Sequence, residues 1–179
     1  YRVGCDPQHR LDPKALAAAL DSAQRAGRRP VAVVASACTT ATGSFDPIEP
    51  IAEFCAREGL WLHVDAAHGG AAILSPKYRS LLAGIERADS FTVDPHKWLF
   101  APYDSAALVY RTPELASAAH AQHGDYLDEV DRSQWNPSDY AFHLSRRARG
   151  LPLWFSLATH GTAAYTEAIV DHNVLGKQT

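Results

Sequence analysis

The chain has 179 residues, a formal net charge of −3, 46% hydrophobic residues and 21% charged residues, a globular composition that suits one domain or part of a larger one. Its charges form no long basic run, which argues against nucleic acid or an anionic membrane surface as partner and favours a small molecule. No stretch reaches the roughly 18 consecutive apolar residues of a membrane span, and no charged-then-apolar leader opens the sequence.

The cysteines and the first residue indicate where the chain works and how it begins. Cys5, Cys38 and Cys55 have no CxxC spacing, which is typical of reduced thiols in a cytosolic protein. We therefore expect a cytoplasmic location. The sequence has no Met and opens on Tyr1, a residue too bulky to follow an excised initiator methionine easily, so we interpret the chain as a fragment of a longer protein.

The first half of the chain is predicted to alternate helices with buried strands. Asp12 is the N-cap of a helix that Gly27 ends, and the continuous apolar run at 31–37 is typical of a strand covered on both faces. The same pattern then repeats, with a helix that starts at Asp46 and a strand at 60–65.

The pattern continues through the middle of the chain. A third helix around 77–85 leads into strands at 90–93 and 105–110. Helices that alternate with buried strands at this spacing predict an α/β fold with a mostly parallel sheet flanked by helices. A polar, aperiodic segment follows the last of these strands, and the closing helices are predicted to break near Gly150 and Pro152.

Reactive side chains follow three of the predicted strands. In open α/β sheets, ligands bind beyond the carboxyl ends of the strands. The first strand ends near Thr40 and the second ends at Asp65, while the third delivers Asp94, His96 and Lys97. The sequence therefore predicts a site where these strand ends meet.

Lys97 is the candidate nucleophile of this site. A lysine beside a carboxylate is most often a solvated ion pair. Here the neighbours Trp98 and Phe100 indicate a buried amine, and burial lowers the pKa of a lysine enough to make its amine nucleophilic. An amine nucleophile needs a carbonyl group.

Asp65 supplies the second half of the prediction. It could cap the helix that follows, but the small residues after it leave room for a flat ligand, and a buried carboxylate needs a cationic partner. These small residues are Ala66, Ala67, Gly69 and Gly70. Pyridoxal phosphate meets both demands, since it has an aldehyde for the amine of Lys97 and a ring nitrogen whose protonated form a carboxylate stabilises.

Three segments carry a family resemblance. "HVDAAHGG" at 63–70, "DSFTVDPHKWLF" at 89–100 and "YD" at 103–104 resemble the group II pyridoxal-phosphate decarboxylases, which include the aromatic amino acid, histidine, glutamate and diaminobutyrate decarboxylases. The resemblance runs over nearly the whole chain. It implies the aspartate aminotransferase type fold, fold type I, and a carboxy-lyase that converts an L-amino acid into its amine and CO₂.

The resemblance also implies roles for individual residues. Lys97 would form the internal Schiff base, Asp65 would pair with the pyridinium nitrogen, and Ala67 would pack against one face of the ring. Three more residues would lie beside the cofactor: Thr40, His96 and Asp94. Asp94 and His68 depart from the Asn of the animal enzymes and the Tyr common in aromatic decarboxylases.

Tyr126 coincides with the tyrosine that family decarboxylases bring over the site to protonate Cα. The alternative is a surface tyrosine in a loop. Its presence favours simple decarboxylation over the oxidative deamination of relatives that lack it, so Tyr126→Phe should divert product from amine towards aldehyde.

The resemblance extends to substrate and assembly. Arg146 and Arg147 match an arginine pair near the cofactor, although a solvated helix start is the plainer interpretation. An aromatic or related substrate is favoured, and Ser145 favours a hydroxyl or imidazole over an indole. Residues 1–179 would be the central and C-terminal part of the large domain of a homodimer, without the N-terminal segment and the small C-terminal domain.

Other functions stay open at this point. A metal-dependent hydrolase is the alternative from another class, although no spacing matches a zinc pattern such as HExxH. Its ligands would come from His63, Asp65, His68, Asp94, His96 and His123. An aminotransferase would use the same Asp65 and Lys97, and a binding module without activity is a further possibility.

Overall fold

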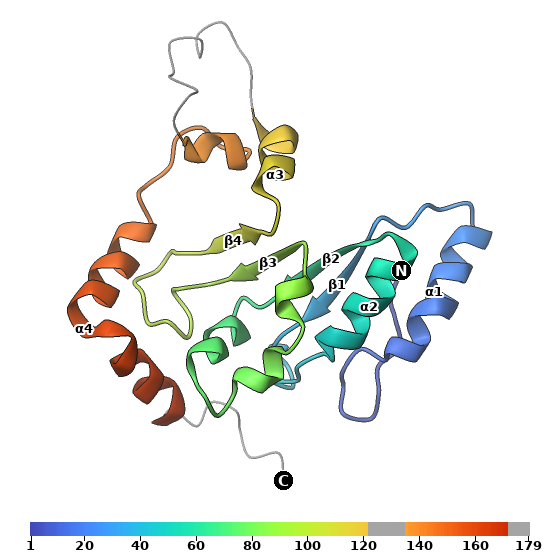
Figure 1. The fold of residues 1–179 in the computed structure, drawn as a ribbon, viewed down its shortest axis with the longest axis horizontal. Coiled ribbons are helices and arrows are strands. Elements are labelled where there is room, and N and C mark those ends of the chain that lie inside the picture. The colour runs from blue at the N-terminus through green and yellow to red at the C-terminus, as the bar shows by residue number, and fades with distance from the viewer. Residues whose placement is uncertain (122–134, 172–179) are drawn as a thin grey trace, which may run out of the picture. The chain divides into compact units, whose positions relative to one another are not determined.

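The computed structural model describes residues 1–121 and 135–171 (Figure 1). The chain divides into two compact units, which are Tyr1–Val109 with Arg149–Thr179, and Tyr110–Ala148. The predicted reactive strand ends all belong to the first unit. Within the described residues, no helix is long and apolar enough to cross a membrane.

A four-stranded sheet organises the first unit. Its strands are β1 Ala32–Ser36, β2 Trp61–Asp65, β3 Ser90–Val93 and β4 Ala107–Tyr110, in the order β1-β2-β3-β4. β1 pairs with β2 and β2 with β3 in parallel, while the β4 arrow in Figure 1 points against that of β3. The α/β fold with a mostly parallel sheet is confirmed.

The first two predicted helices are confirmed, with one correction at a cap. α1 Pro13–Arg25 begins where the Asp12 carboxylate accepts from the backbone N–H of Lys14, and α2 Ile48–Glu58 ends at Gly59 in the left-handed conformation, φ 65°. Asp46 does not cap α2, because its two carboxylate oxygens accept from the N–H groups of Leu11 and Ser36 at 2.6 and 2.7 Å.

The predicted third helix is wrong. The chain instead forms three short 3₁₀ helices, η1 Gly69–Leu74, η2 Arg79–Leu82 and η3 Ile85–Arg87. Gly84, at φ 92°, lies too close to Glu49 for any side chain, since a Cβ there would be 2.7 Å from the Cα of Glu49. A left-handed residue pressed against α2 cannot continue a helix through this segment.

The later helices also differ from the prediction. α4 Gly150–Asp171 begins at Gly150, and Pro152 lies in its first turn, where proline is tolerated. The break falls instead at Gly161, at φ 72° and ψ 164°. In the second unit, the structure adds the unpredicted helices α3 Pro113–His120 and η5 Pro137–Tyr140.

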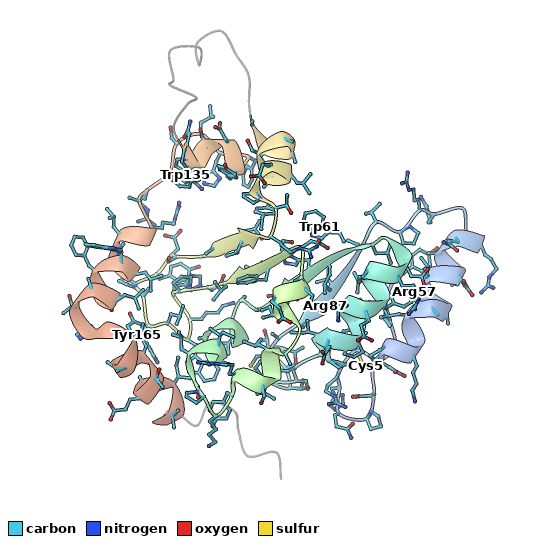
Figure 2. The ribbon with its side chains drawn as sticks, in the orientation of Figure 1. Cys5, Arg57, Trp61, Arg87, Trp135 and Tyr165 are labelled. Atoms are coloured by element: carbon cyan, nitrogen blue, oxygen red, sulfur yellow. The ribbon has the colours of Figure 1, made fainter. Side chains whose placement is uncertain are left out.

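The sheet buries one face in this chain. Leu62 and Val64 of β2 are in the hydrophobic core with Ile48 and Ile51 of α2. On the opposite face Val34 of β1 is 58% exposed, so the prediction of a first strand covered on both faces is wrong. The open face carries the alternate residues of β2, among them Trp61, labelled in Figure 2.

Candidate functional site

The loops that follow the first three strands join at one edge of the sheet. The N–H of Gly69 donates to the carbonyl of Ala37 at 3.3 Å, which links the loop after β2 to the end of β1. The N–H of Asp94 donates to the carbonyl of Ala67 at 2.9 Å, which links the loops after β2 and β3. The predicted convergence of strand ends is therefore present in the structure.

Lys97 lies in the turn after β3 beside a carboxylate. Its Nζ is 2.8 Å from Oδ2 of Asp94, and Nε2 of His96 is 3.9 Å from the same oxygen. The Lys97 side chain is 40% exposed and that of Asp94 is 12% exposed. The predicted burial of the amine is wrong, since Trp98 turns inward and Lys97 does not. The amine is open to an incoming carbonyl group.

His96 is held by the loop that precedes β4. Its Nδ1 lies against the backbone N–H and C=O of Ser105, and its ring meets the edge of Tyr103 at 4.7 Å between centroids. These contacts fix the imidazole next to Asp94. His96 can therefore donate to or accept from a group that binds at the Lys97 amine.

Arg149 anchors this loop and was missed by the sequence analysis. Its Nε donates to Oδ2 of Asp104 at 3.2 Å, and its carbonyl accepts from the Ser105 hydroxyl at 3.3 Å. The predicted pair Arg146 and Arg147 belongs to the second unit. The sequence signal for Arg149 was the presence of a third arginine two residues after that pair.

Asp65 is the last residue of β2 and faces solvent. Its Oδ1 accepts from the N–H of Ala67 at 3.2 Å, an Asx-type turn that holds the carboxylate over the strand end. Ala66 is buried, and Ala67 is half-buried. The carboxylate therefore stands beside small residues, where a flat ring has room.

Two histidines flank Asp65 along the chain and make separate contacts. The ring of His68 stacks on Trp98 with centroids 5.2 Å apart, and burial, with a smaller effect of the Lys97 charge, lowers its pKa. Burial also lowers the pKa of His63, while the charge of Asp65 raises it. The imidazole of His68 therefore stacks on an indole, whereas the imidazole of His63 is hydrogen-bonded to two hydroxyl groups.

The metal-site alternative finds no support in the part of the chain that is described. No group of three His, Cys, Asp or Glu side chains gathers there with metal-binding geometry. His63, His68 and His96 each engage a different neighbour. His123, the remaining predicted ligand, lies outside the described residues.

The other predicted site residues divide into three cases. Thr40 is exposed in the loop after β1, at the same edge as Lys97. Ser145 is exposed in the second unit. Tyr126 lies outside the described residues.

The chemistry of this donor set fits pyridoxal phosphate. An accessible amine at Lys97 suits the aldehyde, and an exposed carboxylate at Asp65 suits the protonated ring nitrogen. The two residues that directly follow Asp65 are Ala66 and Ala67, so the chain next to this carboxylate carries only methyl side chains.

Comparisons with known proteins agree with this chemistry. Residues 2–179 match the family model described as pyridoxal-dependent decarboxylase conserved domain. The aromatic-L-amino-acid decarboxylase of Bacillus atrophaeus is 36% identical over 177 residues, which are 97% of this chain and 37% of that protein. Human cysteine sulfinic acid decarboxylase is 36% identical over 179 residues, 98% of this chain and 36% of that protein.

A solved structure shares the fold. The crystal structure of Oryza sativa TDC with PLP and tryptamine superposes with a TM-score of 0.85 at 34% identity, covering 92% of this chain and 34% of that one. The chain therefore spans little more than a third of the length of the relatives that it matches.

Proposed function

The chain belongs to the pyridoxal-dependent decarboxylase family, and on this premise we propose that the complete protein removes the α-carboxylate of an L-amino acid to release the amine and CO₂. The observation that carries the proposal is the meeting of two strand ends, one with the open amine of Lys97 and the other with the open carboxylate of Asp65. When bound, pyridoxal phosphate accepts the electron pair that CO₂ leaves behind.

Lys97 and Asp65 would hold the two ends of the cofactor ring system. The Lys97 amine would attach to the aldehyde. The ion pair between this amine and Asp94, at 2.8 Å, holds the amine in position before the cofactor binds. Asp65 would keep the ring nitrogen protonated, because a neighbouring anion raises the pKa of a cationic acid. The small Ala67 would pack against the ring.

Two further residues would contact the cofactor, and a third would stay with the amine. The imidazole of His96, fixed by Ser105, would contact the bound cofactor, and the Thr40 hydroxyl would donate to it from the loop after β1. Asp94 would stay with the amine of Lys97, since its carboxylate would repel a phosphate.

Tyr126 would return the proton to Cα after CO₂ departs, as a general acid. Tyr126→Phe should shift product from the amine towards the aldehyde, measured by chromatography of both products from one reaction. An unchanged ratio of the two products would remove Tyr126 from this role.

The substrate would be an aromatic or related L-amino acid. The matched relatives are named for aromatic and for cysteine sulfinic acids, so the test is a panel that contains both classes, with amine and CO₂ quantified for the complete protein. A Lys97→Ala variant is the control. CO₂ release that persists in this variant, or amine release from no member of the panel, would contradict the proposal.

We also propose a cytoplasmic homodimer. All three cysteines are free thiols, as in a reducing compartment, and α4 exposes Leu151, Trp154 and Phe155, an apolar set that a second subunit could cover. Light scattering of the complete protein measures its mass in solution, and a monomer would rule out this assembly.

A further inference from the structure

A row of hydrogen-bonded side chains crosses the open face of the sheet between β2 and β3. The indole N–H of Trp61 donates to the Ser90 hydroxyl at 2.9 Å, and that hydroxyl lies 2.8 Å from Nδ1 of His63. On the far side of the imidazole, the Thr92 hydroxyl lies 3.2 Å from Nε2. Parallel strands usually present apolar side chains on such a face, so this polar row needs an explanation.

The row accommodates a neutral imidazole in either tautomer. A hydroxyl both donates and accepts, so whichever nitrogen of His63 lacks a proton can accept from the hydroxyl that it faces. The other nitrogen donates to the remaining hydroxyl. Burial favours this neutral form, because it lowers the pKa of His63 more than the charge of Asp65 raises it.

The row ends beside Asp65. His63 and Asp65 are two residues apart on β2, so their side chains share one face of the sheet. In the strand register, Thr92 is the direct partner of Asp65, as Ser90 is of His63. Thr92 therefore contacts the imidazole and is also the strand neighbour of the carboxylate. Trp61 and Ser90 fix the far side of the ring.

We propose that His63 is a positioning residue which, with Ser90 and Thr92, holds an uncharged polar wall against Asp65 and so reserves the charge of this carboxylate for the ring nitrogen of the cofactor. The inference rests on the proposed function. A charged group in the place of His63 would compete with the ring nitrogen for Asp65, whereas an apolar one would leave the carboxylate free to turn away.

The test is the protonation of the ring nitrogen in the complete protein, loaded with pyridoxal phosphate labelled with nitrogen-15 at that atom. Its chemical shift, followed against pH, gives the pH at which the nitrogen loses its proton. We expect His63→Phe and Thr92→Val to lower that pH by about one unit or more, since the opposing charge of Asp65 would be less well placed. Thr166→Val is the matched control, because its hydroxyl donates to Leu74 instead.

Loading is scored separately by borohydride reduction and peptide mapping of each variant. Full labelling of the Lys97 peptide with an unchanged titration in both His63→Phe and Thr92→Val would overturn the inference and leave the proposed function intact. Absence of the label in the unmodified protein would remove the proposed function itself. Should His63→Phe fail to fold, the conservative Thr92→Val decides alone.

Discussion

His63 and His68 make the stability of the protein sensitive to acid. Burial is the main cause that lowers the pKa of both imidazoles below the ordinary value of 6.5. Below that value the unfolded chain binds protons that the folded chain does not, so the free energy of unfolding falls as the pH falls towards the folded-state pKa values. Above it the two histidines contribute no such dependence.

We expect His68→Phe to flatten this dependence. Phenylalanine keeps an aromatic ring against Trp98 but binds no proton, so urea unfolding midpoints measured on either side of the ordinary histidine pKa should differ less than in the unmodified protein. His120→Phe, a histidine of α3 in the second unit, is the control. An acid dependence as steep in His68→Phe as in the control would contradict the assignment.

The meeting of the strand ends that carry Asp65 and Lys97 could be predicted from residue types and spacing, but the exposure of these two side chains could not. Asp65 ends one strand and Lys97 follows another, and the apolar pattern of both strands is plain in the sequence. The aromatic neighbours of Lys97 indicated burial, yet only Trp98 is buried, because the turn closed by Asp94 directs adjacent side chains to opposite sides. Sequence alone does not give the direction of a side chain within a turn.

At the scale of elements, Gly69 lets the loops after β1 and β2 approach each other. A Cβ there would lie 2.6 Å from the carbonyl oxygen of Ala37 and 2.8 Å from the Cβ of Cys38. We expect Gly69→Ala to cost roughly 1–3 kcal/mol of unfolding free energy, as overpacking does, measured by urea unfolding. Gly150→Ala, with no atom within 4 Å of its new Cβ, should be neutral, and equal effects of the two would contradict the packing argument.

Asp46 joins the N-terminal segment to the end of β1. This carboxylate, 7% exposed, accepts from the N–H groups of Leu11 and Ser36, and an amide can accept only one of them without bringing its own N–H₂ against the other. Asp46→Asn should therefore cost about 2 kcal/mol or more. Asp12→Asn is the matched control, because asparagine caps a helix as well as aspartate does; a similar loss in both variants would refute the bridging role.

The elements with a strong local pattern could be predicted, and those set by distant contacts could not. Asp12 caps the start of α1 and Gly59 ends α2, and both residues are adjacent in sequence to the helix that they bound. The two helices could therefore be predicted from the local sequence. The predicted third helix does not form, because Gly84 lies against Glu49 of α2 in a left-handed conformation. Asp46 has the sequence position of a helix cap, but its carboxylate oxygens accept from the N–H groups of Leu11 and Ser36, which the sequence does not place beside it.

At the scale of the whole molecule, the sequence pattern gave the α/β class but not which face of the sheet this chain covers. The run at 31–37 is apolar throughout, yet Val34 faces the open side. An apolar run indicates which side chains could be buried, but it does not show which element packs against each face of the strand.

That open face leads to a prediction about residues 1–179 as a separate chain. We expect them to bind pyridoxal phosphate at least about tenfold more weakly than the complete protein, because Asp65 and Val34 both lie uncovered on the open face of the sheet. Absorbance titration of both proteins with the cofactor measures the difference. Equally tight, stoichiometric uptake by the two would show that the rest of the protein adds nothing to the site.

The proposed function depends most on a covalent link between the cofactor and the amine of Lys97. The direct measurement is peptide mapping by mass spectrometry of the complete, cofactor-loaded protein after borohydride reduction. We predict a pyridoxyl group on the peptide that contains Lys97 and on no other. A pyridoxyl group on a different lysine, or none in a protein that releases amine and CO₂, would contradict it.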